Sequence, residues 1–150
     1  MKIPYVNFYK QYLNEEKKLI NFFKKIVKKG EFVTSQDEVL KFEKNLKKNL
    51  NTKYALALNS GTDALTLALF AIGIKRGDEV ITPSNSFIAS TAVIIHLGAK
   101  PVFIDVKNDQ NIDENLIESK ITSKTKAIMP VHLTGRVCSM DKICKIARKY

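Results

Sequence analysis

From residue 54 onwards, short apolar runs alternate with longer segments of helical period, and this alternation constrains the fold more than any other feature. The short runs predict strands at 54–58, 79–82, 101–106 and 126–131. The segments between and after them predict helices, the first ending before Gly73 and the others at 86–97, 113–120 and 140–150. Strands that alternate with helices are typical of a parallel sheet covered by helices on both faces. The expected fold class is therefore α/β.

The first third of the chain shows helical periodicity alone. Apolar residues from Phe8 to Val27 recur every three or four positions, and Gly30 follows as a helix end. Ser35 and Glu38 have the spacing of a capping box, which predicts the start of a second helix. The composition shifts near Lys53, so we expect a helical arm over residues 1–53 and an α/β body over residues 54–150.

The net charge of +10 is concentrated in this arm, where 13 Lys stand against 6 acidic residues. The Lys residues fill the positions between the apolar ones, which favours the solvated face of amphipathic helices. An anionic partner remains the alternative. Of the 25 basic residues 22 are Lys, whereas nucleic-acid surfaces usually combine Arg with aromatic side chains. We expect no nucleic-acid partner.

Membrane, secreted and metal-binding classes are not indicated. Apolar runs stay far below the roughly 20 residues of a membrane span, and the N-terminus lacks the apolar stretch of a secretory signal. Cys138 and Cys144 are six positions apart, and neither forms a spaced ligand set with His96 or His132. We expect a reduced, cytoplasmic protein with no metal site.

Three segments at the ends of predicted strands could carry chemistry. The turn Asn59–Ala64 leads from a strand into a helix, and the unpaired amides there could bind a phosphate, with Thr62 adding a hydroxyl. Alternatively, Ser60 and Asp63 form only a capping box. Phe87 follows the second strand and either stacks on a flat ligand or belongs to the core. His132 follows the last strand and is either structural or functional.

Taken together and in order, the motifs resemble the DegT/StrS-type nucleotide-sugar aminotransferases, pyridoxal-phosphate enzymes of the aspartate-aminotransferase fold (fold type I). The resemblance spans essentially all 150 residues, and its most specific stretches are GTDAL and GDEVITP. It implies a three-layer α/β/α large domain with an N-terminal helical arm. The strand–helix series also ends on a helix, so we expect an incomplete domain within a longer parent chain.

The resemblance also implies roles for several residues. Ser60, Gly61 and Thr62 would hold the cofactor phosphate, and Phe87 would stack on the pyridine ring. Phe32 and Thr34 lie in a segment that approaches the sugar in similar enzymes, and His132 lies near the cofactor. Ser35 stands where the family often has Gly.

The implied reaction is the transfer of an amino group, commonly from glutamate, to a keto group on a nucleotide-linked sugar, in a homodimer. The family also uses a Lys that carries the cofactor and an acidic partner of the pyridine nitrogen. No Lys among residues 1–150 matches that position, so no catalytic residue is assigned and the 150 residues alone should not transaminate. The alternatives are a sugar dehydratase of the same family, in which this Lys is replaced, and a non-catalytic paralogue or fragment that binds a partner through the Lys-rich arm.

Overall fold

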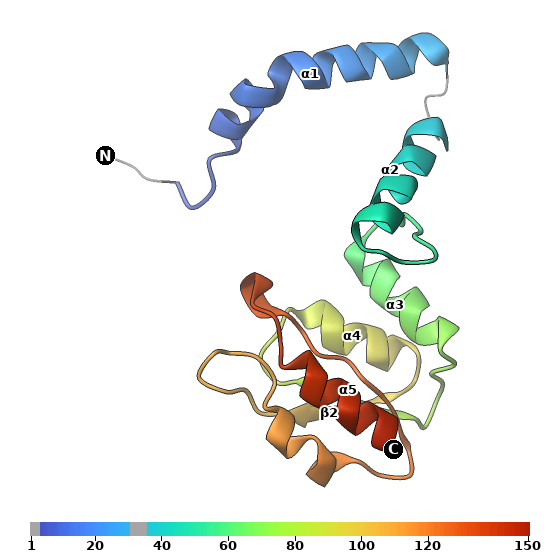
Figure 1. Cartoon of the computed structure of the whole chain (residues 1–150), viewed down its shortest axis with the longest axis vertical. Coiled ribbons are helices and arrows are strands. Elements are labelled where there is room, and N and C mark those ends of the chain that lie inside the picture. The colour runs from blue at the N-terminus through green and yellow to red at the C-terminus, as the bar shows by residue number, and fades with distance from the viewer. Residues whose placement is uncertain (1–3, 31–35) are drawn as a thin grey trace. The chain divides into compact units, whose positions relative to one another are not determined.

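The computed structural model describes residues 4–30 and 36–150 and divides into two compact units (Figure 1). The first unit ends at Ala57, and the second spans Leu58–Tyr150. Among the described residues, no helix is long and apolar enough to cross a membrane.

The first unit contains two amphipathic helices, as the periodicity predicts. α1 (Phe8–Lys29) begins after Asn7, whose side chain accepts a hydrogen bond from the Lys10 amide at 2.9 Å. It ends at Gly30, which takes the left-handed conformation that a helix end favours. α2 (Gln36–Asn49) follows, and every Lys on the two helices is exposed, as are large apolar residues such as Phe23 and Leu40. Ser35, the expected cap of α2, lies outside the described residues.

The second unit is built on a sheet of three parallel strands in the order β2-β1-β3. The strands are β1 (Glu79–Pro83), β2 (Lys100–Ile104) and β3 (Thr125–Ile128). Every residue of the central strand β1 is buried, which is the pattern of a parallel strand covered on both faces.

Helices cover both faces of this sheet. α3 (Gly61–Ala71) and α4 (Ile88–His96) pack on one face, in an apolar cluster that includes Leu69, Val80 and Val93. α5 (Met140–Lys149) packs on the other face, in a cluster that includes Ile81, Ile104 and Ile143. Val80 and Ile81 are neighbours on β1 and point to opposite faces, as successive strand residues do. The unit therefore has three layers, which confirms the expected α/β/α fold class.

The prediction of a strand at residues 54–58 is wrong. The segment has no ladder with any strand of the described chain, and both Tyr54 and Leu56 are largely exposed. A strand exists only through hydrogen bonds to a neighbouring strand, so an apolar run alone is insufficient. The Ala57 amide instead donates to the Glu43 carboxylate at 2.8 Å.

The predicted helix at 113–120 is also wrong, because the structure has two short 3-10 turns there, η1 (Glu114–Leu116) and η2 (Glu118–Lys120). The Asp113 carboxylate accepts from the Asn115 amide at 3.0 Å, and the Ser119 hydroxyl donates to the Leu116 carbonyl at 2.8 Å. Such local side-chain bonds compete with helix formation. The other predicted helices and strands are present, with ends shifted by a few residues.

Candidate functional site

The carboxyl ends of the strands and the amino ends of two helices lie at one edge of the sheet. Parallel strands all end at the same edge. α4 leaves the carboxyl end of β1 and returns to the opposite edge, where the Gly77 amide donates to the Gly98 carbonyl at 3.3 Å. α3 also ends at that opposite edge, because only residues 72–78 connect it to β1. The amino ends of α3 and α4 therefore lie towards the carboxyl edge.

Ser60 caps α3, as the sequence predicts. Its hydroxyl oxygen accepts from the Asp63 amide at 3.0 Å, and the hydroxyl donates to the Asp63 carboxylate at 2.7 Å. This is half of a capping box, because the Asp63 carboxylate bonds to the Ser60 hydroxyl rather than to its amide. Within the described chain, the amides of Gly61 and Thr62 donate to no acceptor. Two backbone donors at the positive end of the helix dipole are thus available to an anion.

Gly61 itself has no structural reason to be glycine. Its φ is not positive, and a Cβ built on its backbone would meet no other part of the described chain within 4 Å. The absent side chain instead leaves open space over the two free amides. An oxyanion can approach a backbone closely where no Cβ intervenes. The cap, the amides and this open space fit a phosphate group, such as that of pyridoxal phosphate.

Phe87 is the N-cap residue of α4 and follows the carboxyl end of β1 after three intervening residues. Its ring is 74% exposed, so it does not belong to the core of this structure. It caps no amide through its side chain, and its backbone is extended. The exposed ring at this edge is available to stack on a flat partner.

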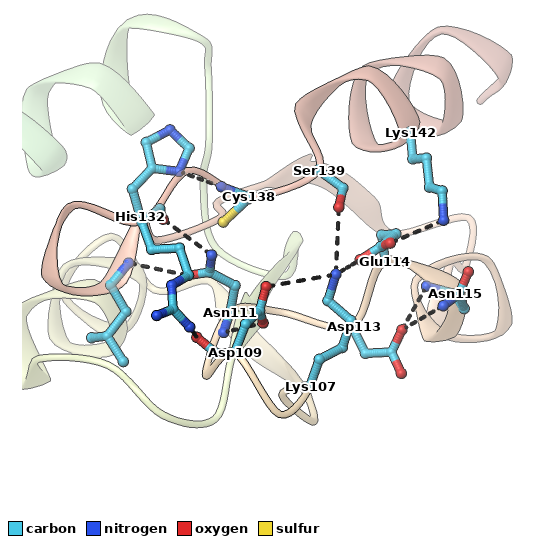
Figure 2. Close-up of polar contacts among 12 residues, drawn as sticks. Lys107, Asp109, Asn111, Asp113, Glu114, Asn115, His132, Cys138, Ser139 and Lys142 are labelled. Atoms are coloured by element: carbon cyan, nitrogen blue, oxygen red, sulfur yellow. Dashed lines mark hydrogen bonds and ion pairs between the residues drawn. The ribbon is translucent and has the colours of Figure 1, made fainter.

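His132 lies after β3, with an exposed ring. Its Nδ1 accepts a hydrogen bond from the Cys138 amide at 3.2 Å (Figure 2). A backbone amide is always a donor, so the neutral ring carries its proton on Nε2. Cys138 is structural, because its thiol donates to the Val131 carbonyl at 3.2 Å and burial raises the pKa of that thiol.

The topology brings Ser60, Gly61, Thr62, Phe87 and His132 to the same edge of the sheet. Phe32 and Thr34, the other expected substrate residues, lie outside the described residues. In the described part of the chain, no group of three or more His, Cys, Asp or Glu side chains could hold a metal ion.

The sequence reasoning missed a polar cluster in the turn that follows β2. Glu114 is 4% exposed and lies between Lys107, whose Nζ is 2.7 Å from Oε2, and Lys142, whose Nζ is 3.1 Å from Oε1 (Figure 2). The hydrogen bond from Lys107 lowers the pKa of Glu114 to about 2, against the opposing effect of burial. Glu114 stands between Asp113 and Asn115 in a largely polar segment, so nothing in the sequence distinguished it from a solvated turn residue.

The same turn touches the two loops that carry Phe87 and His132. Gln110 accepts a hydrogen bond from the Asn85 side chain at 2.9 Å, two residues before Phe87. Asn111 is 1% exposed and bonds to the loop after His132. Asn, Asp and Gln at 109–113 were the sequence signal for this turn, but nothing in the spacing shows which loops the side chains reach.

The fold and this edge define a three-layer α/β/α domain with two free backbone amides at the start of a helix. The sequence model of the DegT/DnrJ/EryC1/StrS aminotransferase family matches residues 13–150, and the chain belongs to this family.

Several curated relatives carry the names of enzymes that modify sugars. The chain is 40% identical over 149 residues to dTDP-3-amino-3,6-dideoxy-alpha-D-galactopyranose transaminase of Aneurinibacillus thermoaerophilus, covering 99% of this chain and 41% of the relative. It is 48% identical over 115 residues to GDP-perosamine synthase of Caulobacter vibrioides, covering 75% of this chain and 30% of the relative. The chain thus spans well under half the length of these relatives.

Solved structures show the same fold. DesV of S. venezuelae, solved in complex with a ketimine intermediate, superposes with a TM-score of 0.94 at 33% identity, covering 99% of this chain and 40% of that chain. NtdA of Bacillus subtilis, solved with bound PMP, superposes with a TM-score of 0.92 at 35% identity, covering 99% of this chain and 34% of that chain.

Proposed function

We propose that this chain is the phosphate-binding part of a pyridoxal-phosphate-dependent aminotransferase that acts on a nucleotide-linked sugar. Family membership supports the class of reaction. The names of similar proteins support the substrate class, since they specify dTDP-, GDP- and UDP-linked sugars. The observation that carries the proposal is the pair of free backbone amides at the start of α3, beside a glycine whose Cβ position is open space in the described structure.

In this proposal Ser60, Gly61 and Thr62 hold the cofactor phosphate. The Ser60 side chain sets the first turn of α3, and the amides of Gly61 and Thr62 donate to the phosphate oxygens. Phe87 covers one face of the pyridine ring, which excludes water from that face. When bound, pyridoxal phosphate accepts electron density from the carbon that carries the amino group and thereby makes the proton on that carbon removable.

His132, Phe32 and Thr34 are proposed to contact the sugar substrate. His132 presents Nε2–H as a hydrogen-bond donor, because Nδ1 is already occupied by the Cys138 amide. A donor in this place suits a hydroxyl or carbonyl oxygen of the sugar. No residue of this chain is proposed as the group that moves the proton.

The proposal also covers the domain division, the oligomeric state, the cellular compartment and the amino donor. Residues 1–53 would form a helical arm and residues 54–150 the first part of the cofactor domain. The functional protein would be a cytoplasmic homodimer that uses glutamate as the amino donor. The two free thiols are consistent with a reducing compartment.

The test follows the two halves of the reaction in the purified full-length protein that contains this chain, loaded with pyridoxal phosphate. Glutamate alone should yield one equivalent of 2-oxoglutarate per bound cofactor. Adding dTDP-, GDP- or UDP-linked keto-sugars should allow turnover and produce an amino sugar with one of them. A protein that dehydrates the sugar without consuming glutamate, or that binds no cofactor, would overturn the proposed transamination.

A further inference from the structure

The loop after His132 contains two consecutive residues in unfavourable or left-handed backbone conformations. Thr134 has φ 53 and ψ 24, the left-handed region, and Gly135 follows with φ 86. This conformation is uncommon for a β-branched residue and costs on the order of 1–3 kcal/mol. The two residues reverse the chain within the short turn η3 (Leu133–Gly135), so that residue 138 returns to His132.

The Asn111 side chain makes one hydrogen bond to each end of this turn. Its Oδ1 accepts from the Leu133 amide at 3.2 Å, and its Nδ2 donates to the Arg136 carbonyl at 3.0 Å. The first bond is made to the first residue of the turn and the second to the residue directly after it. An amide donor on one side and a carbonyl acceptor on the other fix the orientation of the carboxamide. Figure 2 shows Asn111 beside the loop that carries His132.

The backbone of Asn111 is itself held firmly. Val106 and Ile112 form an antiparallel bridge, and the Lys107 amide donates to the Asn111 carbonyl at 2.9 Å. The Asn111 amide donates to the Asp109 carboxylate at 3.0 Å. The Asn111 side chain is 1% exposed. Removing it takes one bond from the Arg136 carbonyl and one from the Leu133 amide, which keeps its bond to the Val131 carbonyl at 2.9 Å. Asn111 is thus a rigid point against which the more strained loop is fixed.

The conformation of this turn determines whether His132 keeps its hydrogen bond from the Cys138 amide. The Cys138 amide can reach Nδ1 at 3.2 Å only while the turn keeps its reversal. We propose that Asn111 is a positioning residue, which holds the loop so that the Cys138 amide fixes the tautomer of His132 and Nε2–H is presented at the edge of the sheet. This inference rests on the proposed function for its purpose, which is to orient a donor towards the sugar.

The test is the tautomer of His132, read by NMR of the protein labelled with ¹⁵N-histidine. In the parent protein at a pH where the ring is neutral, Nδ1 should be the unprotonated nitrogen and Nε2 the protonated one. In Asn111→Ala, the two tautomers should become mixed, and the amide of Cys138 should exchange with solvent at least about tenfold faster. Asn108→Ala is the matched control, because Asn108 is an exposed residue of the same turn, and it should behave as the parent.

Activity gives a second readout. If His132 contacts the sugar, Asn111→Ala should lower kcat/KM for the sugar by a larger factor than it lowers the half-reaction with glutamate. A role confined to stability would lower both alike. Cofactor binding and the glutamate half-reaction test the proposed function, whereas the tautomer is read without cofactor or substrate, so the two can fail separately.

Asn111→Asp keeps the test decisive if the alanine variant does not fold. Aspartate retains the acceptor for the Leu133 amide and loses the donor to the Arg136 carbonyl. We expect mixed tautomers of His132 in this variant too, with the Leu133 amide still protected. A single parent-like tautomer and a parent-like exchange rate of the Cys138 amide, in whichever variant folds, would overturn the positioning role.

Discussion

Replacing Glu114 by Gln should remove a large, pH-dependent part of the stability of the second unit. The carboxylate is buried and joins the turn after β2 to α5, through Lys107 at 2.7 Å and Lys142 at 3.1 Å. Glutamine has nearly the same shape but no charge. The variant therefore loses both ion pairs and leaves the half-buried Lys107 with only the longer ion pair to Asp109, at 4.0 Å.

The magnitude follows from the pKa of Glu114, which is lowered from 4.5 to about 2 by the hydrogen bond from Lys107 first of all. At about 1.36 kcal/mol per pKa unit, this lowering sets an upper bound of about 3 kcal/mol. The side chain of Lys142 is 63% exposed, and solvent screening reduces the figure to about 2 kcal/mol. Because the folded pKa is lower than the unfolded one, this stability is present above pH 4.5 and is lost as the pH falls towards 2.

Urea unfolding of the parent and of Glu114→Gln at a series of pH values measures this difference. At pH 7 the variant should be less stable by about 2 kcal/mol, and the two proteins should converge towards pH 2. Glu118→Gln is the control, because the Glu118–Lys149 pair at 3.2 Å is exposed and should contribute below about 1 kcal/mol. Equal stability of Glu114→Gln and the parent at pH 7, or a gap that persists at pH 2, would refute the reasoning.

Two further substitutions test the cofactor residues. Thr62→Val removes an exposed hydroxyl that makes no bond in the described structure, so the unfolding free energy should change by less than about 0.5 kcal/mol, while titration should show weaker binding of pyridoxal phosphate. An unchanged affinity would remove Thr62 from the phosphate site. Phe87→Ala should cost little stability because the ring is exposed, and it should weaken cofactor binding by about two- to tenfold, the worth of a stacked aromatic. Cofactor dissociation by gel filtration and absorbance decides this, and parent-like retention would contradict the stacking role.

Apolar spacing and capping residues in the sequence predicted the helices that have a clear apolar face or a side-chain cap. The spacing of apolar residues and Gly30 predicted α1, and the Ser60 cap predicted the start of α3. The segment at 54–58 was misjudged because a strand depends on a partner that sequence order does not reveal. The helix at 113–120 was misjudged because Asp113 and Ser119 bond to the backbone instead of supporting a helix.

In the candidate site too, residues that act on sequence neighbours were easier to predict than residues that act on distant loops. The Ser60 cap could be found because capping uses adjacent residues, and the phosphate-binding roles of Ser60, Gly61 and Thr62 stay a prediction. Asn111 could not be found, since its partners lie 22 and 25 positions away and its residue type is ordinary for a turn. Residues that act through a distant loop become visible only once the topology brings the strand ends together.

The affinity of Gly61→Ala for pyridoxal phosphate, beside its affinity for pyridoxal, tests the central claim most directly. The backbone of Gly61 accepts alanine without strain or collision, so the variant should be as stable as the parent or more stable by up to about 1 kcal/mol. The added methyl would occupy the open space over the amides. The account predicts an at least tenfold loss of affinity for pyridoxal phosphate, or about 1.4 kcal/mol, with the affinity for pyridoxal unchanged. Equal affinities of parent and variant for pyridoxal phosphate would contradict it.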